Sequence, residues 1–204
     1  MSKFSSEQKQ ILVGTLLGDG YIYRDRYDGC YLEIKHSEKQ KDYVFWMHKN
    51  LSDFCPSGPK QRKDNNQWKF MTSSNEDPQS FRKSFYQEGR KIVPKNIQEM
   101  LTHPLGLAVW YMDDGSLDYR PRSHYNYSLS TNSFTLEENQ LLVDVLKDNF
   151  GITVSVQTPL CRGVHYPELY IGVAGRDKFI ETIKPYLLPC FKYKIPPFER
   201  LNYD

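Results

Sequence analysis

The chain has little that would mark a secreted, membrane-embedded or zinc-binding protein. Its 204 residues include only four cysteines, Cys30, Cys55, Cys161 and Cys190, and none of them forms a CxxC pair. This spacing indicates neither a zinc module nor a redox motif. The sequence also lacks a run of about 18 apolar residues, and its first seven residues lack the apolar stretch of a secretory signal. We therefore expect a globular intracellular protein with reduced cysteines, in a bacterial cytoplasm or an organelle.

A strong excess of charge is also missing. The formal net charge is +2 and the isoelectric point is near 8.2, whereas dedicated small DNA-binding domains often exceed about 9. Basic residues crowd into segments that we expect to be strands and connections, while acidic residues gather on a predicted helix over residues 136–150. A basic face with an acidic back would give a small net charge, but so would randomly mixed surface charge. Net charge alone leaves the class of partner open.

The chain does contain an internal repeat. One apolar run ends in Leu17-Gly18-Asp19-Gly20 and another in Met112-Asp113-Asp114-Gly115, so Asp19 and Asp114 lie 95 residues apart (114 − 19). Both runs are apolar enough to be buried helices. The last turn of a helix carries partial negative charge, so a carboxylate there is unfavourable by about 0.3 to 1 kcal/mol. A divalent cation between the two helix ends would remove this penalty, and we expect one shared metal site.

The same order of elements follows each motif, namely hairpin, helix, hairpin and helix. In the first half we expect strands at 21–24 and 31–35, a helix at 40–51, strands at 59–63 and 67–72, and a helix at 78–87. In the second half we expect strands at 116–122 and 125–131, a helix at 136–150, strands at 153–157 and 169–173, and a helix at 176–187. Gly20, Gly115 and Gly151 follow predicted helices, where a left-handed residue is usual. We predict an α+β fold with two αββαββα halves, residues 1–87 and 103–204, joined by residues 88–102.

The motif strings at 12–20 and 107–115 resemble those of the LAGLIDADG homing endonucleases in their single-chain, two-motif form. The resemblance covers nearly the whole chain. It implies a pseudo-twofold fold in which the motif helices pack at the centre and the antiparallel sheets form a DNA-binding saddle. It also implies a monomeric, magnesium-dependent DNA endonuclease of intron homing, which cuts both strands and leaves short 3' overhangs. By the same resemblance, Mn²⁺ should substitute for Mg²⁺, and Ca²⁺ should bind without supporting cleavage.

The resemblance also assigns a metal site. Asp19 and Asp114 would hold the metal by their side chains, and Gly18 and Asp113 would assist by their backbone carbonyls. Hard, oxygen-ligated magnesium suits this set, since phosphodiester hydrolysis needs an activated water and charge compensation. Val109 stands where the first motif has Gly14, so we expect the two helices to pack without full symmetry.

The remaining catalytic candidates lie outside the motifs. Lys91 and Lys194 each precede a proline by two or three residues and match the one lysine per half that the family places near the scissile phosphates. His36 and Asn132 fall near the ends of the second strand of each half, where the family often has a polar residue that organises water. A merely polar strand end remains the alternative for these two residues.

Outward-facing strand residues are the natural DNA contacts, because a two-stranded ribbon fits the major groove. Side chains alternate between the two faces of a strand, so residues that contact bases lie on one face and core residues on the other. The candidates are Tyr23, Arg24, Arg26, Tyr31, Glu33, Lys35, Arg62, Lys69, Arg120, Arg122, Asn126 and Ser128. The halves differ at nearly every such position, which predicts a non-palindromic double-stranded target. An RNA maturase that binds its own intron RNA, a non-cleaving DNA-binding regulator, and a domain without a nucleic-acid partner are the alternatives. Both aspartates and both lysines are present, which favours the nuclease.

Overall fold

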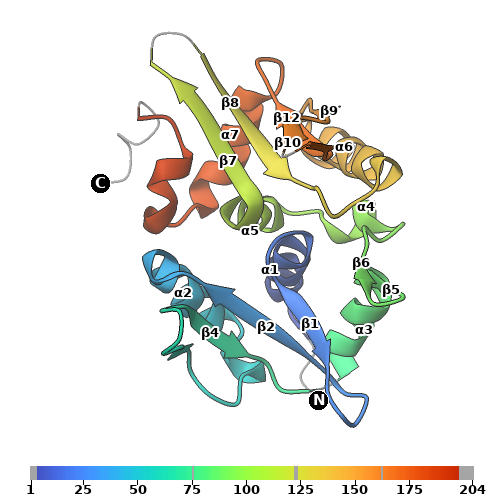
Figure 1. Cartoon of the computed structure of the whole chain (residues 1–204), viewed down its shortest axis with the longest axis vertical. Coiled ribbons are helices and arrows are strands. Elements are labelled where there is room, and N and C mark those ends of the chain that lie inside the picture. Colours follow the sequence, from blue (N-terminus) through green and yellow to red (C-terminus); the bar gives the residue numbers. More distant parts are fainter. Residues whose placement is uncertain (1–3, 75, 122–123, 162, 198–204) are drawn as a thin grey trace.

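The chain forms two similar halves that meet along a central pair of helices (Figure 1). The computed structural model describes residues 4–74, 76–121, 124–161 and 163–197. The first half contains α1 (Ser6–Leu17), β1 (Tyr21–Arg24), β2 (Cys30–His36), η1 (Glu38–Gln40), α2 (Lys41–Asn50), η2 (Ser52–Phe54), β3 (Lys60–Gln61), β4 (Trp68–Met71) and α3 (Glu76–Phe85). The connection adds β5 (Tyr86–Gln87), β6 (Arg90–Lys91) and α4 (Ile97–Met100).

The second half repeats this order. It contains α5 (Pro104–Asp114), β7 (Gly115–Arg120), β8 (His124–Ser130), α6 (Leu136–Phe150), β9 (Ser155–Gln157), β10 (Leu160–Cys161), β11 (Val164–His165), β12 (Glu168–Ile171), α7 (Arg176–Ile183), η3 (Lys184–Tyr186) and η4 (Pro189–Lys194). Each half has a four-stranded antiparallel sheet, in the orders β1-β2-β4-β3 and β7-β8-β12-β9. The predicted α+β class and the αββαββα order of each half are confirmed. Within the described residues, no helix has both the length and the apolar character needed to cross a bilayer.

Two helices end earlier than the sequence predicts. The helix expected to reach residue 87 ends at Phe85, because Tyr86 and Gln87 form the first strand of a short hairpin with β6. The helix expected to reach residue 187 ends at Ile183. There Pro185 lies in η3, and a proline lacks the amide hydrogen that a longer α-helix needs. The hairpin has a consequence for the site, since it carries Lys91.

Capping side chains fix where the well-defined helices begin. The Ser5 side chain accepts a hydrogen bond from the Gln8 backbone N–H, and the Ser5 backbone N–H donates in return to Oε1 of Gln8, which makes a capping box at the start of α1. Thr135 and Glu138 form the same arrangement at the start of α6, and Gly151 ends that helix in the left-handed conformation. The expectation for Gly151 is confirmed.

The expectation that Gly20 and Gly115 are left-handed is wrong. Gly115 has a φ of −78°, and Gly20 is absent from the glycines with positive φ. These residues are needed for space instead. A Cβ on Gly115 would lie 2.0 Å from Cδ2 of Tyr111, and one on Gly20 would lie 2.7 Å from Oγ1 of Thr15. The chain therefore turns back closely over the helix that it has just left.

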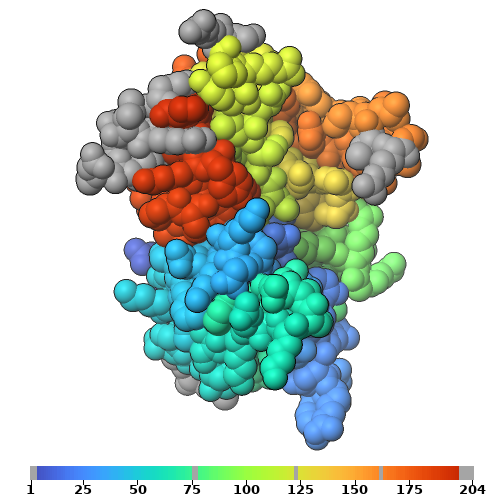
Figure 2. Space-filling view, turned by 60° about the vertical axis from the view of Figure 1, so that its left-hand side comes forward, coloured from blue at the N-terminus to red at the C-terminus, as the bar shows by residue number. Residues whose placement is uncertain are grey.

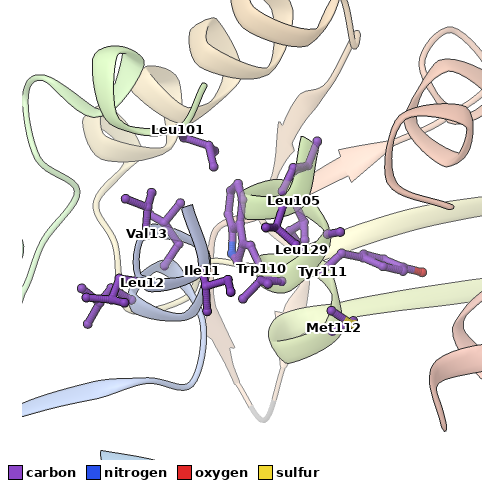
Figure 3. Close-up of a cluster of buried hydrophobic side chains, with 14 of the residues drawn as sticks. Ile11, Leu12, Val13, Leu101, Leu105, Trp110, Tyr111, Met112 and Leu129 are labelled. Atoms are coloured by element: carbon purple, nitrogen blue, oxygen red, sulfur yellow. The ribbon is translucent and has the colours of Figure 1, made fainter. Parts of the chain in front are cut away.

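The helices α1 and α5 pack against each other through small residues. A Cβ on Gly14 would lie 2.3 Å from the carbonyl oxygen of Gly106 and 2.8 Å from Cβ of Val109. The expected asymmetry is therefore real, because Val109 occupies the room that Gly14 leaves. Around this contact lies a fully buried apolar cluster in which Trp110 points toward Val13 of α1 (Figure 3).

The C-terminal segment also holds the halves together. Figure 2 shows η4 (red) lying directly against the region of α2 (light blue). The ring of Phe191 packs edge-on against that of Tyr43, with centroids 5.0 Å apart. Tyr43 is fully buried, and its hydroxyl reaches the second motif helix, as described below.

Candidate metal and nucleic-acid site

The two motif helices end differently, although their sequences align. Helix α1 ends at Leu17 and Gly18 is its C-cap, whereas α5 continues through Asp113 and Asp114 and is capped by Gly115. The two ends still face the same region, because the negative charges of Asp19 and Asp113 both act on Asp114. Three carboxylates therefore gather where two helix ends meet.

Lys91 and Lys194 reach these helix ends. The ammonium of Lys91 donates to the carbonyl oxygens of Gly18 and Gly20 over 2.7 and 2.8 Å. The ammonium of Lys194 donates to the carbonyl of Met112 over 2.7 Å, with longer contacts to Tyr111 and Asp113. A cation at a helix C-terminus is favourable, so each lysine lies where the helix dipole stabilises it.

Burial shapes the protonation of these lysines. It lowers the pKa of Lys194 to about 8, although the nearby charges of Asp113, Asp114 and Asp19 act in the opposite direction. Burial lowers the pKa of Lys91 as well, against the same three carboxylates. The lysines and carboxylates thus form one electrostatic unit of opposite charges.

Asp113 lies beneath this unit. Its carboxylate has no solvent exposure and accepts hydrogen bonds from the hydroxyl of Tyr43 over 2.7 Å, from the hydroxyl of Thr15 over 2.8 Å, and from the backbone N–H of Asp19 over 3.2 Å. Burial raises the pKa of Asp113 to about 7, despite the lowering effect of the Tyr43 and Thr15 hydrogen bonds. No pattern in the sequence predicts that the Asp113 side chain connects three other residues.

Asp19 and Asp114 face their surroundings differently. The side chain of Asp19 is 53% exposed, whereas Asp114 is partly buried. Burial raises the pKa of Asp114 to about 7, and the charges of Asp19 and Asp113 raise it further. A further positive charge in this cluster would lower the pKa of Asp114, as the charges of Lys91 and Lys194 already do.

His36 lies between two of the carboxylates. Its Nδ1 is 3.7 Å from Oδ2 of Asp19, and its Nε2 is 3.6 Å from Oδ1 of Asp113. Burial lowers the pKa of His36 to about 4, although the charge of Asp19 raises it. The imidazole is therefore neutral at neutral pH and offers one donor and one acceptor to this region.

Asn132 does not match His36 in the second half. Strand pairing relates Tyr21 with Glu33 and Ser116 with Ser128, so an offset of 95 residues connects the halves and puts Thr131 at the position of His36. Asn132 is one residue further along and exposed. Strand β8 ends at Ser130, so Asn132 lies in the turn that follows it. The position that matches His36 is therefore Thr131 and not Asn132, and the role of Asn132 in organising water stays a prediction.

The donor set at the helix ends suits a hard divalent cation. Asp19, His36 and Asp113 each present a ligand atom within 4.8 Å of the others, and the Asp114 carboxylate adds more oxygen close by. Mg²⁺ prefers such oxygen donors. The carbonyl oxygens of Gly18 and Asp113 already accept hydrogen bonds from the two lysines. If these oxygens are metal ligands, as predicted, they would contact the metal and an ammonium group at the same time.

Most predicted DNA contacts of the first half share the sheet face away from the apolar core. Alternation along the paired strands puts Tyr23, Tyr31, Glu33, Lys35 and Lys69 on this face. Tyr23 and Tyr31 stack with ring centroids 5.6 Å apart, and Lys69 forms an ion pair with Glu33 at 2.9 Å. The face therefore combines flat aromatic surface with charge.

Three arginines of the first half lie elsewhere. Arg24 pairs with buried Cys30 and lines a pocket of about 810 Å³ together with Arg82 and Tyr86, on the side of α3. Arg26 lies in the β1–β2 turn with its guanidinium 4.8 Å from the ring centre of Tyr27. Arg62 follows β3 and forms an ion pair with Asp64. Because side chains alternate along β1, Arg24 lies on the opposite face of the sheet from Tyr23 and the other predicted DNA contacts.

The second sheet places Ser128, Asn126 and Arg120 in one outward row. Ser128 shares a hydrogen bond of 2.7 Å with Ser116, and Arg120 pairs with Asp118 at 3.2 Å. Asn126 is 8% exposed, and its amide nitrogen lies 2.9 Å from Nε2 of His124. Arg122 lies outside the described residues.

Sequence reasoning missed Thr15 and Tyr43, which both donate to Asp113. Thr15 is the one hydroxyl residue inside the otherwise apolar stretch Ile11–Leu17, and this is a signal that could have identified it. Tyr43 comes from a helix outside the motif, and its sequence neighbourhood carries no comparable signal.

Two aligned helix ends that carry carboxylates, with a lysine on each and a sheet on either side, define the architecture of the LAGLIDADG class. A model of the LAGLIDADG DNA endonuclease family matches residues 9–179. The chain belongs to this family, as the motif strings predicted.

Individual relatives agree with the family. The chain is 28% identical to Protein RecA of Mycolicibacterium chitae over 96% of its own length and 48% of that protein. It is 27% identical to DNA endonuclease I-ChuI of Chlamydomonas applanata, over 94% of this chain and 95% of the relative. The chain spans about half the length of the RecA relatives that it matches.

Solved structures share the fold. A structure of the homing endonuclease I-WcaI bound to its DNA recognition sequence superimposes with a TM-score of 0.81. The two sequences are 23% identical, and the match covers 96% of this chain and 88% of that one. This similarity establishes the arrangement of helices and sheets.

Proposed function

We propose that this chain is a site-specific endonuclease that hydrolyses both strands of a long, non-palindromic DNA duplex as a monomer. The observation that carries the proposal is the pair of helix ends, where Asp19 and Asp114 lie with one lysine ammonium on the carbonyls of each end. A binding protein would have no need of a buried carboxylate cluster with raised pKa values. A nuclease that recruits a divalent cation would use it.

Asp19 and Asp114 would hold magnesium. When bound, magnesium supplies an activated water and compensates the charge that builds up on the phosphate. Mn²⁺, which accepts the same oxygen donors, should replace it. Ca²⁺, which is larger and takes more ligands, should bind without supporting cleavage. We expect short 3' overhangs, with the two scissile bonds on either side of the helix ends.

Lys91 and Lys194 would act on the phosphates. Both ammonium groups are held at fixed positions by two or three carbonyls, so they would meet developing negative charge without further reorganisation. The neutral His36 beside Asp19 would orient a water molecule through its ring nitrogens. The outward faces of both sheets would contact the DNA grooves.

The decisive experiment uses a randomised duplex library. The protein is incubated with the library and Mg²⁺, and all new ends are sequenced. Parallel reactions contain Mn²⁺ or Ca²⁺. We expect one family of sites with paired breaks and 3' overhangs in Mg²⁺ and Mn²⁺, and retention of the same sites without breaks in Ca²⁺. Cutting that survives Asp19→Asn and Asp114→Asn would contradict the assigned site.

Two outcomes would favour other functions on the same fold. Retention of one duplex sequence without breaks under every metal would indicate a DNA-binding regulator. Binding of an intron RNA in preference to every duplex would indicate a maturase.

A further inference from the structure

We propose that Asp113 is a positioning residue for the cut made on the Asp19 side of the site, and that its loss converts double-strand cleavage into nicking. The proposal rests on the proposed endonuclease function and adds a residue and a strand preference to it. Asp113 would act through Asp19 and His36, which lie near its Oδ2 and its Oδ1, respectively.

The first step is the way in which Asp113 is held. Its carboxylate is fully buried and receives hydroxyl hydrogen bonds from Thr15 of α1 and Tyr43 of α2. Both donors are themselves completely buried. The carboxylate therefore has one fixed position, set by two helices of the opposite half.

The second step is what Asp113 holds in turn. The backbone N–H of Asp19 donates to Oδ2 of Asp113 over 3.2 Å. Among the described residues, the buried Nε2 of His36 has no hydrogen-bond partner, and Oδ1 of Asp113 lies 3.6 Å from it. Asp113 thus restrains the backbone of one expected metal ligand and faces the imidazole beside it.

The third step is that the described part of the second half shows no such network. The offset of 95 residues relates Asp113 to Gly18, Thr15 to Trp110 and His36 to Thr131. Gly18 could not carry a side chain, because its Cβ would lie 2.5 Å from Cβ of Asp113. The space between the helix ends has room for the Asp113 side chain on α5 and for no side chain at Gly18.

The consequence is a difference between the two catalytic positions. Asp19 is supported by Asp113, whereas the described contacts of Asp114 include no equivalent carboxylate. Removing a residue that orients a metal ligand typically reduces activity about 10- to 100-fold. Here the reduction should fall on the strand that is cut on the Asp19 side.

The test uses the full chain and the duplex selected from the library, labelled differently on its two strands. Cleavage of each strand is followed in Mg²⁺ for wild type, Asp113→Asn and Asp113→Gly, the last of which copies the residue of the other half. We expect one strand to be cut about 10- to 100-fold more slowly while the other changes less than about threefold, so that nicked duplex accumulates. Equal slowing of both strands, or no slowing, would overturn the proposal.

Two further variants separate positioning from loss of packing. Thr15→Val removes one donor to Asp113 and should produce the same strand bias, whereas Thr15→Ser keeps the hydroxyl and should restore even cleavage. Gln10→Met is the matched control, because Gln10 is buried in the same helix pair and the hydrogen bonds described for its side chain go to the segment before α5, at Met100, Thr102 and His103. It should lower the melting temperature without changing the ratio of the two cuts.

A measurement without DNA keeps this proposal separate from the proposed function. In amide NMR spectra the Asp19 N–H should move upfield in Asp113→Gly, because it loses a carboxylate acceptor, and should keep its wild-type shift in Gln10→Met. An unmoved Asp19 amide would refute the positioning role even if the protein cuts DNA. A moved amide in a protein that cuts no duplex would refute the proposed function while leaving the contact established.

Discussion

The ammonium of Lys91 donates to the carbonyl of Gly18 over 2.7 Å, although 73 residues separate them in sequence. In the second half, Lys194 donates to the carbonyl of Asp113, which matches Gly18, over 3.3 Å and to that of Met112 over 2.7 Å. In each half, a segment that follows the sheet returns to the end of the motif helix and adds a positive charge there. Lys91 and Lys194 belong to the site because the path of the chain brings each of them back to the end of the motif helix of its own half.

Replacement of either lysine by methionine should therefore abolish most of the activity. Methionine fills a similar volume but cannot stabilise negative charge, so we expect cleavage in Mg²⁺ to fall by about 10²- to 10³-fold, while binding of the selected duplex in Ca²⁺ changes little. Lys95→Met is the control, because Lys95 is exposed in the same connecting segment. If Lys91→Met cut DNA as fast as Lys95→Met, the catalytic assignment would fail.

The motif helices should tolerate no added side chain at their crossing. Gly14→Ala would place a methyl group 2.3 Å from the Gly106 carbonyl oxygen, so we expect a loss of about 1 to 3 kcal/mol in the free energy of unfolding, or roughly 2 to 4 °C per kcal/mol. Val109→Ala should not rescue it, because the nearest obstruction is backbone. Denaturant titration measures both, and Gly58→Ala is the control, since its Cβ would meet no atom within 4 Å. Equal stability of the Gly14 and Gly58 variants would rule out the close crossing.

The fold was predictable because its signals are local. Alternating strands, capping residues such as Thr135 and the two motif strings each depend on a short stretch of sequence, and the structure has those elements nearly where they were expected. The errors have another origin. Gly20 and Gly115 follow helices as left-handed residues usually do, but their conformation is set by how tightly the chain passes Thr15 and Tyr111. Such packing has no signature within one segment.

The site was predictable only in part for the same reason. The carboxylates and lysines recur at matching positions, so comparison of the chain with itself finds them. The side-chain role of Asp113 depends on Thr15, Tyr43 and the absence of a side chain at Gly18, which are brought together only by folding. The mismatch between His36 and Asn132 is an error of one residue, because the register of the paired strands, which fixes the offset of 95 residues between the halves, is set only in the folded sheets.

The two sheet faces should contribute unequally to DNA affinity. Lys35 lies in the outward row opposite Lys69, so Lys35→Ala should weaken binding and make the log-log salt slope shallower by about 0.9, as expected for one lost phosphate contact. Arg24→Ala should leave the slope unchanged, because Arg24 lines the pocket on the side of α3. The measurement is a titration in Ca²⁺ at several salt concentrations. We expect a wild-type slope near −9 for about ten neutralised phosphates, and a slope near −2 would contradict an extended groove.

The buried carboxyls should make the stability of the metal-free protein depend on pH. The pKa values of Asp113 and Asp114 are raised to about 7, well above the ordinary value of 3.8, so the folded state binds more protons than the unfolded state between these values. Their contribution to stability is full below about pH 4 and is lost as the pH rises through about 7. His36 acts in the opposite direction, because its folded pKa is lowered to about 4.

The difference between wild type and Asp113→Asn isolates the carboxyl. In EDTA, the melting temperature of wild type should fall more steeply from pH 5 to pH 8 than that of the variant, because the amide does not ionise. Added Ca²⁺ should stabilise wild type more at pH 8 than at pH 5, since the ligands must be deprotonated to bind it. Parallel melting curves for the two proteins in EDTA would show that Asp113 is already ionised at pH 5. The charge that favours a cation at these helix ends would then have to come from Asp19 and Asp114 alone.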